Sequence, residues 1–354
     1  MAIYAIWNNK GGVGKSYLTF QLASEYARQH PTKKVLVVDL CPQANSSSML
    51  LGGMVVGEQH LNNIHGQQPR LTISGYIDDR ILSPYVPTKS GADYITQVCK
   101  YNDKVPSNVY LIVGDEKLEL QSSRVSSATD RNRGPDDAWR IVHLWVKDLI
   151  SDIKYSWKDT DTCVFIDCNP SFSVYTELAL TAADRLLIPF SADGSSKRAV
   201  KAVLSLVYGK RRQLGDRQSD FYIETNSHRM SLPEIYMYIG NRLTQMNNSS
   251  ASAFKTVVDE ISDEIYSEWQ SSDTPFCIHP SGTPKPNNKK TFKNMFQFEV
   301  NDANTASVVS GALGIPIGIL TAGQKVVAGK TVTVNQSQLD RQVPNIKDLV
   351  KRIE

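Results

Sequence analysis

The stretch NNKGGVGKS, residues 8–16, decides how the rest of this 354-residue chain is interpreted. It follows a short apolar run, residues 3–7, and precedes a segment with helical spacing. In a strand–loop–helix unit, glycines let successive N–H groups point inward, so that they form an anion-binding nest at the positive end of the helix. Lys15 supplies a charge for the outer phosphates of a nucleotide, and the Ser16 hydroxyl is a magnesium ligand. The loop therefore predicts binding of a nucleoside triphosphate.

The loop carries a second lysine, Lys10, at its start. Residues 10–16 resemble the deviant Walker A box of the ParA/MinD superfamily, whose members hydrolyse ATP as sandwich dimers. The resemblance implies that Lys15 faces the phosphates of its own subunit, whereas Lys10 reaches the phosphates of the partner. The expected nucleotide-binding residues of this segment are Gly11, Gly12, Val13, Gly14, Lys15, Ser16 and Tyr17.

Residues 35–38 form an apolar run, which is typical of a strand covered on both faces. A segment with acidic and amide side chains follows this run. Residues 39–45, DLCPQAN, resemble the family's D-x-D-P-Q-x-N box. Asp39 corresponds to the aspartate that holds a magnesium-bound water. Cys41 stands where the family has the catalytic aspartate that positions the attacking water, and a thiol is a poor acceptor for that task. ATP hydrolysis is therefore expected to be weak, unless another carboxylate or amide, including one from the partner subunit, takes over this role.

Two later strands extend the resemblance. Residues 163–167 form an apolar strand that ends in an acid, Asp167, as a Walker B magnesium site requires. Residues 182–190, AADRLLIPF, are similar to the family's A-A-D-x-x-x-I-P strand, and the polar turn 191–196 opens another helix. The implied magnesium ligands are Ser16, Asp39 and Asp167.

The strand at residues 235–242 ends in Asn241 and Arg242, which resembles the family's N-R strand end. The resemblance implies that both residues bind the nucleotide and that Asn241 reads the adenine edge. Residues 296–300 resemble the family's last strand. The apolar stretch 308–322 is too short to span a membrane, and we interpret it as a helix end that leads into a buried strand.

The order of these segments predicts a P-loop α/β fold. We expect a doubly wound, mostly parallel sheet of about seven strands with helices on both faces. Residues 1–354 are expected to form a single P-loop ATPase domain, with surface insertions near 53–75, 124–137, 209–233 and 271–294. Residues 46–48 and 52–53 look like a loop.

Composition adds few constraints. The formal net charge is +3, and the five cysteines show neither C-x-x-C nor zinc-ligand spacing, so we expect reduced thiols in a cytoplasmic protein. The N-terminus has no basic leader and does not look like a signal peptide.

The leading interpretation is a ParA-like ATPase that acts in plasmid or DNA partition, or in cargo positioning. The resemblance implies ATP and Mg²⁺ as cofactors, a homodimer, non-specific DNA and a ParB-like or adaptor activator protein as partners, and association with the nucleoid. Basic residues cluster at 210–212 with Arg217, at 285–293 and near the C-terminus. The residues expected to contact DNA are Lys347, Lys351 and Arg352.

Two other functions remain open. A MinD-like membrane-cycling ATPase would use a C-terminal amphipathic helix, and four apolar residues do share one helical face: Ile346, Leu349, Val350 and Ile353. A short helix packed on the sheet explains the same pattern better, so a membrane partner is not expected. The third function is a nucleotide-sensing regulatory or defence module that binds ATP with little turnover, and Cys41 is its main support.

Overall fold

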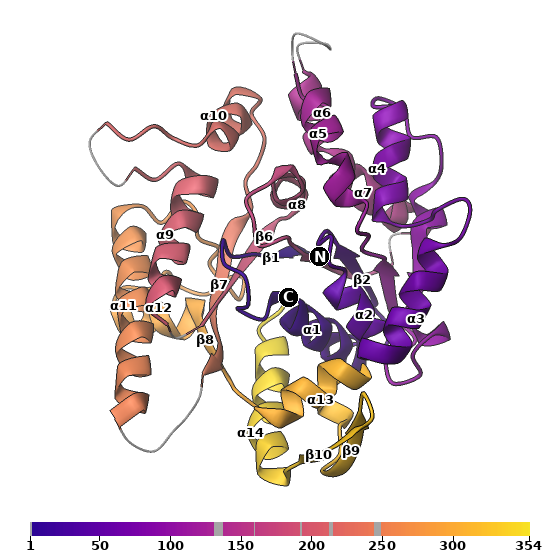
Figure 1. The fold of residues 1–354 in the computed structure, drawn as a ribbon. Coiled ribbons are helices and arrows are strands. Elements are labelled where there is room, and N and C mark those ends of the chain that lie inside the picture. The colour runs from indigo at the N-terminus through magenta and orange to yellow at the C-terminus, as the bar shows by residue number, and fades with distance from the viewer. Residues whose placement is uncertain (1, 131–136, 159, 192, 212–214, 244–248) are drawn as a thin grey trace.

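The computed structural model describes residues 2–354 except 131–136, 159, 192, 212–214 and 244–248; for 242–243 and 249–254 it describes the backbone alone. Its centre is an eight-stranded sheet with the order β3-β4-β2-β5-β1-β6-β7-β8 (Figure 1). The strands are β1 (Ile3–Ile6), β2 (Lys34–Asp39), β3 (Ile95–Gln97), β4 (Val109–Ile112), β5 (Thr162–Asp167), β6 (Arg185–Phe190), β7 (Glu234–Leu243) and β8 (Gln297–Asn301). All neighbours pair in parallel except β3 and β4, so the predicted fold class is confirmed.

Alternating side chains of the central strands feed two hydrophobic cores. In β1, Ile3 and Ala5 enter one core and Tyr4 and Ile6 enter the other, as the two-residue period of a strand requires. The first core is covered by α4 (Ile73–Leu82), α5 (Leu118–Ala128), α6 (Ala138–His143), α7 (Trp145–Ser156), α8 (Val174–Ala182), α9 (Gly194–Tyr208), α10 (Asp220–Ser227), α11 (Ser249–Ser271), α12 (Lys289–Phe296) and the 3₁₀ turn η1 (Gly91–Tyr94). The second is covered by α1 (Lys15–Gln29), α2 (Asn45–Leu50), α3 (Gly53–His65), α13 (Thr305–Leu313), α14 (Gln336–Val350) and the 3₁₀ turns η2 (Val98–Lys100) and η3 (Ile317–Ile319).

The register of the parallel strands creates the functional edge. Asp39 at the end of β2 is the direct partner of Asp167 at the end of β5, and Ile6 at the end of β1 also pairs with Asp167. Because parallel strands end at the same edge, the glycine loop after β1 and both acidic strand ends meet there.

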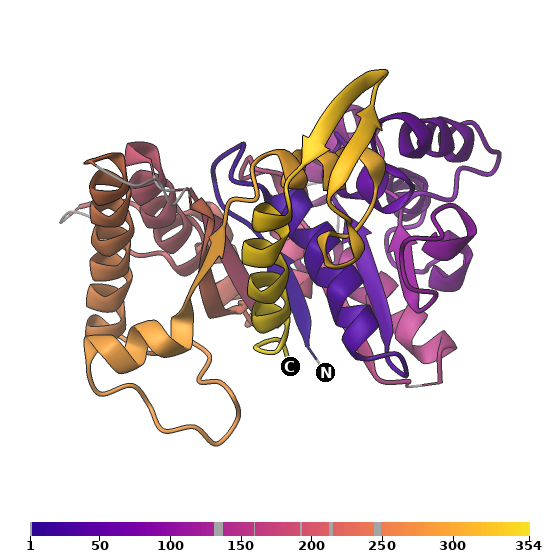
Figure 2. The same ribbon diagram turned by 90° about the horizontal axis from the view of Figure 1, so that it is seen from below.

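The structure contains strands that the sequence did not suggest. β3 is a three-residue antiparallel strand at one margin of the sheet. β9 (Gly323–Val327) and β10 (Lys330–Val334) form a separate antiparallel hairpin that contacts α13 and projects from the rest of the fold (Figure 2). The alternation of apolar and polar residues in these short segments covers too few residues to distinguish a strand from a loop.

Two local expectations were wrong, and one segment expected as a surface insertion is helical and anchored in the core. Residues 45–50 form a helix, α2, because Ser47 donates from its backbone nitrogen and hydroxyl to Asp39 and so anchors this segment below β2. The region 53–75 contains α3, whose Leu61 and Ile64 are buried in the second core. After α13 the chain enters the 3₁₀ turn η3 and no buried strand, because Gln21 accepts the N–H of Ile317 at 2.8 Å.

The apolar face of α14 packs inside the protein. Ile346, Leu349, Val350 and Ile353 are each at most 5% exposed and belong to the second core. This is the packing expected of a helix that covers a sheet. No helix in the described part of the chain is both long enough and apolar enough to cross a membrane.

Candidate functional site

The glycine loop runs from β1 into α1 with an open backbone. Gly12 and Gly14 have φ values of 76° and 80°, a conformation that side chains disfavour. At Gly11 and Gly12 an added Cβ would meet no atom within 4 Å, so the loop presents bare backbone to solvent. No side chain caps the start of α1, and its first N–H groups are therefore available to an anion.

Lys15 lies over this loop. Its ammonium group donates to the carbonyls of Lys10 at 2.8 Å and Asn8 at 3.4 Å, and the residue is 6% exposed. Burial lowers the pKa of Lys15, while the nearby Asp167 opposes that change. The ammonium charge is thus held against the backbone of the loop, where the phosphates of a nucleotide would bind.

The two acidic strand ends differ in their contacts. Asp39 accepts three hydrogen bonds, from the backbone of Cys41 at 3.0 Å and from the backbone and hydroxyl of Ser47 at 3.0 and 2.7 Å. Both carboxylate oxygens of Asp167 are buried and have no hydrogen-bond partner among the described residues. Burial raises the pKa of Asp167 to about 7, with a further contribution from Asp39, while the nearby Ser16 hydroxyl lowers it.

These residues fit a magnesium ion. A buried, unpartnered carboxylate is costly unless a cation or donor completes it, and Mg²⁺ prefers carboxylate and hydroxyl oxygens. Ser16, Asp39 and Asp167 are brought together as the sequence predicted, with Asp167 as the group that most needs the cation.

A cavity of about 400 Å³ lies above this edge. Its lining consists of Gly11, Gly12, Gly14, Lys15, Ser16, Tyr17, Cys41, Gln43, Asn45, Met49, Cys168 and Pro170. The sequence analysis assigned no individual role to five of these residues: Gln43, Asn45, Met49, Cys168 and Pro170. Gln43 and Asn45 follow a strand end at a ligand-binding edge, which was a usable signal, whereas nothing in the sequence marks Met49.

Cys41 is buried in the wall of the cavity and is 4% exposed. Burial raises the pKa of its thiol to about 12, and the carboxyls of Asp39 and Asp167 add to the effect. The side chain is therefore a neutral thiol, which accepts hydrogen bonds poorly.

The other predicted nucleotide-binding residues, Asn241, Tyr17 and Arg242, differ in how they lie relative to the cavity. Asn241 is buried and donates to the carbonyl of Val13 at 2.9 Å, while its own Oδ1 has no partner among the described residues and is free to accept. Tyr17 lines the cavity, but its hydroxyl donates to Gln342 of α14 at 3.1 Å. The backbone of Arg242 lies in β7, and its side chain is outside the described residues.

Lys10 does not reach into the cavity of its own chain. Its ammonium group contacts the carboxylate of Asp193 and lies 3.2 Å from the hydroxyl of Ser191 and 3.3 Å from that of Ser196. Burial favours a higher pKa for Asp193, but hydrogen bonds from Lys10, Ser191 and Ser195 hold that pKa well below its usual range. Asp193 also caps α9 by accepting the N–H of Ser195 at 3.0 Å. The sequence marked this segment only as a polar turn.

The basic clusters of the sequence are largely neutralised within the fold. α11 carries acidic side chains that pair with lysines of α9 and α12 and of the segment after α9. The pairs are Lys197–Glu260, Lys201–Glu264, Lys210–Glu268, Lys289–Asp263 and Lys293–Asp259. Lys285 pairs with Asp273 and Arg217 with Asp220, while Arg212 lies outside the described residues.

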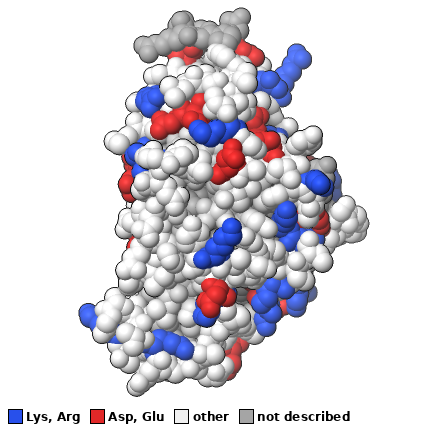
Figure 3. Space-filling view, turned by 90° about the vertical axis from the view of Figure 1, so that its right-hand side faces the viewer, with Lys and Arg blue, Asp and Glu red and all other residues white. Residues whose placement is uncertain are grey.

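The three expected DNA contacts also differ from one another. Lys347 is half-buried, and Lys351 is exposed and pairs with Asp348 at 2.8 Å. Arg352 donates to the carbonyls of Asn294 and Gln297 and lies 4.9 Å from the ring centre of Phe298, so it serves the junction of α12 and β8. On the face that includes α3 and α4, basic and acidic side chains are interspersed among wide uncharged areas (Figure 3).

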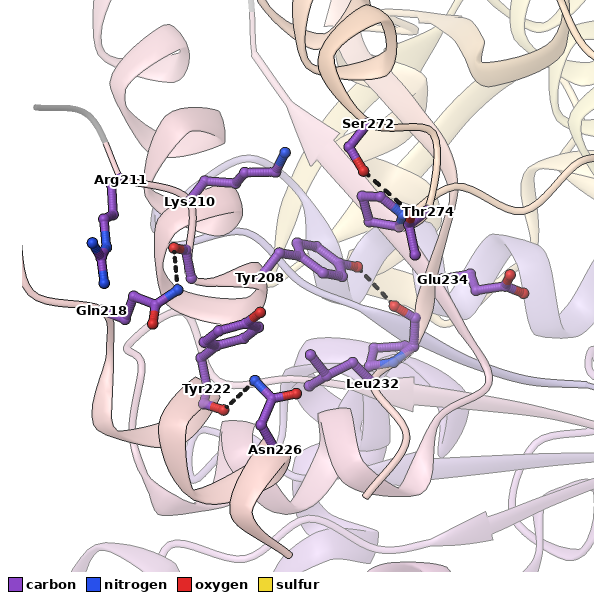
Figure 4. Close-up of a pocket in the computed structure, with 13 residues that line it drawn as sticks. Tyr208, Lys210, Arg211, Gln218, Tyr222, Asn226, Leu232, Glu234, Ser272 and Thr274 are labelled. Atoms are coloured by element: carbon purple, nitrogen blue, oxygen red, sulfur yellow. Dashed lines mark hydrogen bonds between the residues drawn. The ribbon is translucent and has the colours of Figure 1, made fainter. Parts of the chain in front are cut away.

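A larger cavity, of about 680 Å³, lies near the start of β7 (Figure 4). Tyr208 donates to Pro233 across its wall, and the ring of Tyr222 lies against Gly209, where an added Cβ would approach within 2.3 Å. It contains none of the predicted nucleotide residues. Of its charged residues Lys210, Arg211 and Glu234, Lys210 pairs with Glu268 and Glu234 with Arg185. This cavity is therefore separate from the glycine-loop site.

Comparison with known proteins agrees with this geometry. Residues 1–215, more than half of the chain, match the family described as "AAA domain". The chain is 24% identical over 215 residues to the chromosome-partitioning ATPase Soj of Treponema pallidum, covering 59% of this chain and 63% of that protein. It is 27% identical over 192 residues to the chromosome partitioning protein ParA of Myxococcus xanthus, covering 54% and 52%. These matches span less than two thirds of either relative.

Among solved structures, apo McdA of Cyanothece superposes with a TM-score of 0.59 at 16% identity, covering 99% of this chain and 98% of that one. A likeness at this identity shows the shared fold alone. With the family match and the glycine loop of residues 10–16, it establishes that the chain belongs to this AAA domain family, within the ParA/MinD superfamily of deviant Walker A P-loop proteins.

Proposed function

We propose that this protein is a ParA-like ATPase that binds ATP with Mg²⁺, forms an ATP-dependent sandwich dimer and acts in DNA partition or cargo positioning. The observation that carries the proposal is the buried, unpartnered carboxylate of Asp167 beside Ser16 and the open glycine loop. Such a group is expected where a metal ion accompanies a nucleotide. The names of the relatives, Soj and ParA, point to partition.

Within this proposal the chain's residues divide the work. The loop N–H groups and Lys15 bind the phosphates, Ser16, Asp39 and Asp167 hold the magnesium, and the free acceptor of Asn241 binds the adenine edge. Bound Mg²⁺ neutralises phosphate charge that develops during transfer. Hydrolysis is slow because Cys41 provides no carboxylate to orient the water.

The proposed dimer depends on Lys10. In the sandwich its ammonium group leaves Asp193 and binds the phosphates of the partner subunit. Lys10 sits in a hydrogen-bonded turn outside its own cavity, which agrees with a role beyond its own nucleotide.

Non-specific DNA binding is proposed for the ATP-bound dimer, because each basic residue is then present twice. Lys347 and Lys351 of the C-terminal region are the proposed contacts. Arg352 is less suited than the sequence suggested, because its guanidinium is already bonded to backbone carbonyls.

A ParB-like or adaptor protein is the proposed activator, and the nucleoid in the cytoplasm is the proposed location. We further propose that the whole chain is one domain, since its sheet draws strands from residues 3–301 and α14 packs on α1.

Two lysine variants test the proposal. Lys15→Ala should abolish nucleotide binding in a fluorescent-ATP titration, because it removes the charge beneath the phosphates. Lys10→Ala should bind ATP as the unaltered protein does and fail to dimerise in light scattering with ATP. Equal loss of binding in both variants would contradict the sandwich model.

The nucleotide-sensor function remains the second candidate, favoured by the neutral thiol of Cys41. It predicts ATP binding with little turnover and no DNA binding. The membrane-cycling function has lost its support, because the apolar face of α14 is buried.

A further inference from the structure

We propose that the cavity of about 680 Å³ near the start of β7 is a second ligand site, for a small molecule that joins a planar ring with N–H donors to one anionic group, as a nucleoside monophosphate does. The inference does not depend on the proposed ATPase function. The volume lies within the range of about 300–1,000 Å³ that is usual for small-molecule sites in proteins. Every residue that lines the cavity belongs to the described part of the chain.

This cavity and the glycine-loop region lie at opposite ends of α9. The helix begins at Gly194, after the turn that holds Lys10, and ends at Tyr208, which lines the cavity. Its 15 residues span about 22 Å at the rise of an α-helix. The cavity is therefore a separate site and not an extension of the proposed ATP site.

The walls of the cavity are held in place without a ligand. Gly209 ends α9 with φ 63°, and the ring of Tyr222 packs so closely on it that an added Cβ would lie 2.3 Å from the ring. Gln218 Nε2 donates to the carbonyl of Gly209 at 3.1 Å, and the hydroxyl of Tyr208 donates to the carbonyl of Pro233 at 2.8 Å. The loop after α9 and the segment before β7 are thus both fixed around the cavity.

Two amide side chains of the lining keep acceptor oxygens free. Gln218 and Asn226 each use the amide nitrogen to donate to a backbone carbonyl, that of Gly209 and that of Tyr222. Neither Gln218 Oε1 nor Asn226 Oδ1 has a hydrogen-bond partner among the described residues. An amide oxygen only accepts, so these two atoms favour a ligand that carries N–H donors.

Arg211 supplies the charge that the ligand must match. Of the charged residues in the lining, Lys210 is paired with Glu268 and Glu234 with Arg185. Arg211 is exposed, and no hydrogen bond or ion pair joins its guanidinium to another described residue. Arg211 also lines a neighbouring cavity of about 210 Å³ between α9 and α11. A guanidinium with unused donors binds a phosphate or carboxylate group through two parallel hydrogen bonds.

The arrangement of these groups fits one molecule. Figure 4 shows Arg211 and Gln218 on one side of the cavity and Thr274 on the other, with the rings of Tyr208 and Tyr222 between them. An anionic group on Arg211 therefore leaves the attached ring beside the tyrosines. Flat aromatic rings are the surfaces on which a planar ligand ring stacks.

Adenosine monophosphate (AMP), adenosine and inorganic phosphate are the probes, each titrated separately in a calorimeter. AMP should bind at least about tenfold more tightly than adenosine or phosphate, because both of its parts have partners in the cavity. Arg211→Ala should weaken AMP binding by about tenfold or more, since it removes charge-assisted hydrogen bonds. Arg217→Ala is the matched control, because this exposed arginine follows in the same loop, pairs with Asp220 and does not line the cavity. It should leave the AMP affinity unchanged.

The Lys15→Ala protein excludes binding at the glycine loop, which lacks its phosphate-binding charge in that variant. AMP should still bind Lys15→Ala, and adding Arg211→Ala to it should again weaken AMP binding by about tenfold or more. A Lys15→Ala protein that binds no AMP would place the molecule in the glycine loop and overturn the inference. Equal AMP affinity with and without Arg211 would also overturn it, and so would phosphate that binds as tightly as AMP.

Discussion

In this conformation the ammonium group of Lys10 contacts the carboxylate of Asp193, the residue that also caps α9. The lysine that distinguishes this loop is therefore engaged within its own chain. In the proposed dimer, the contact of Lys10 with the partner's phosphates would replace this ion pair, so that Asp193 would compete with those phosphates for Lys10.

Asp193→Asn should strengthen ATP-dependent dimerisation. Asparagine still caps a helix, so α9 keeps its N-terminus, while Lys10 loses its ionic partner. The pair is partly exposed, with side-chain exposures of 22% and 46%, so we expect about a two- to fivefold lower dimer dissociation constant. Light scattering with ATP and with ADP measures this, and Asp220→Asn, which breaks the exposed pair with Arg217, is the matched control. A dimer no tighter than that of the unaltered protein would show that the ion pair has no restraining effect.

Cys41→Asp should raise the steady-state rate of ATP hydrolysis by about tenfold or more, which corresponds to about 1.4 kcal/mol of barrier. The carboxylate provides the strong acceptor that the neutral thiol lacks. Phosphate release at saturating ATP measures the rate, and Cys99→Asp, at a half-exposed position away from the cavity, controls for the added charge. An unchanged rate would mean that the water is fully oriented by other groups.

The Asp167 carboxyl should make the metal-free protein less stable as the pH rises. Its pKa is raised from 3.8 to about 7 by burial and by Asp39, so the folded state binds this proton more tightly than the unfolded state does. The resulting stability is complete below about pH 4 and is lost as the pH passes through about 7, at most roughly 4 kcal/mol for such a shift. Thermal unfolding at pH 6 and pH 8 in a chelator measures it.

Asp167→Asn provides the corresponding control. It should reduce that pH dependence, to which Asp39 also contributes because burial raises its pKa too, and stabilise the metal-free protein at pH 8, while abolishing the further stabilisation by ATP with Mg²⁺. A variant with the same pH dependence as the unaltered protein would place the titrating group elsewhere.

DNA binding by the ATP-bound dimer should depend on Lys347 and Lys351. The affinity for DNA falls as salt is added. Replacing both lysines with alanine should make the plot of log affinity against log salt less steep, by about 0.9 for each phosphate that the dimer no longer neutralises. Lys289→Ala with Lys293→Ala is the control of equal charge change, because those lysines already neutralise Asp263 and Asp259. Equal effects of the two pairs would exclude the C-terminal region as the DNA-binding surface. Arg352→Ala is unsuitable here, because it also breaks the bonds to Asn294 and Gln297.

The parts of this protein that were predictable from sequence are those governed by local chemistry. The glycine loop, the strands ending in Asp39 and Asp167, and the helix after the loop each have a pattern of adjacent residues that fixes them. The partners of Lys10 and Arg352 were not predictable, because they come from residues far along the chain. The ion pairs of α11 escaped prediction for the same reason, since clusters of lysines look basic until the carboxylates of another helix are placed against them.

The central position of β1 has a consequence for how this chain is made. β1 pairs with β5 and β6, which end at residues 167 and 190, so during synthesis β1 waits for well over a hundred residues before either of its neighbours has been made. Pairing over such sequence separations slows folding, and until β5 has been made the apolar strand has two open edges that other chains can join. A nascent chain or an N-terminal fragment that stops short of Asp167 therefore lacks both neighbours of β1, and we expect it to aggregate and to need a chaperone during synthesis.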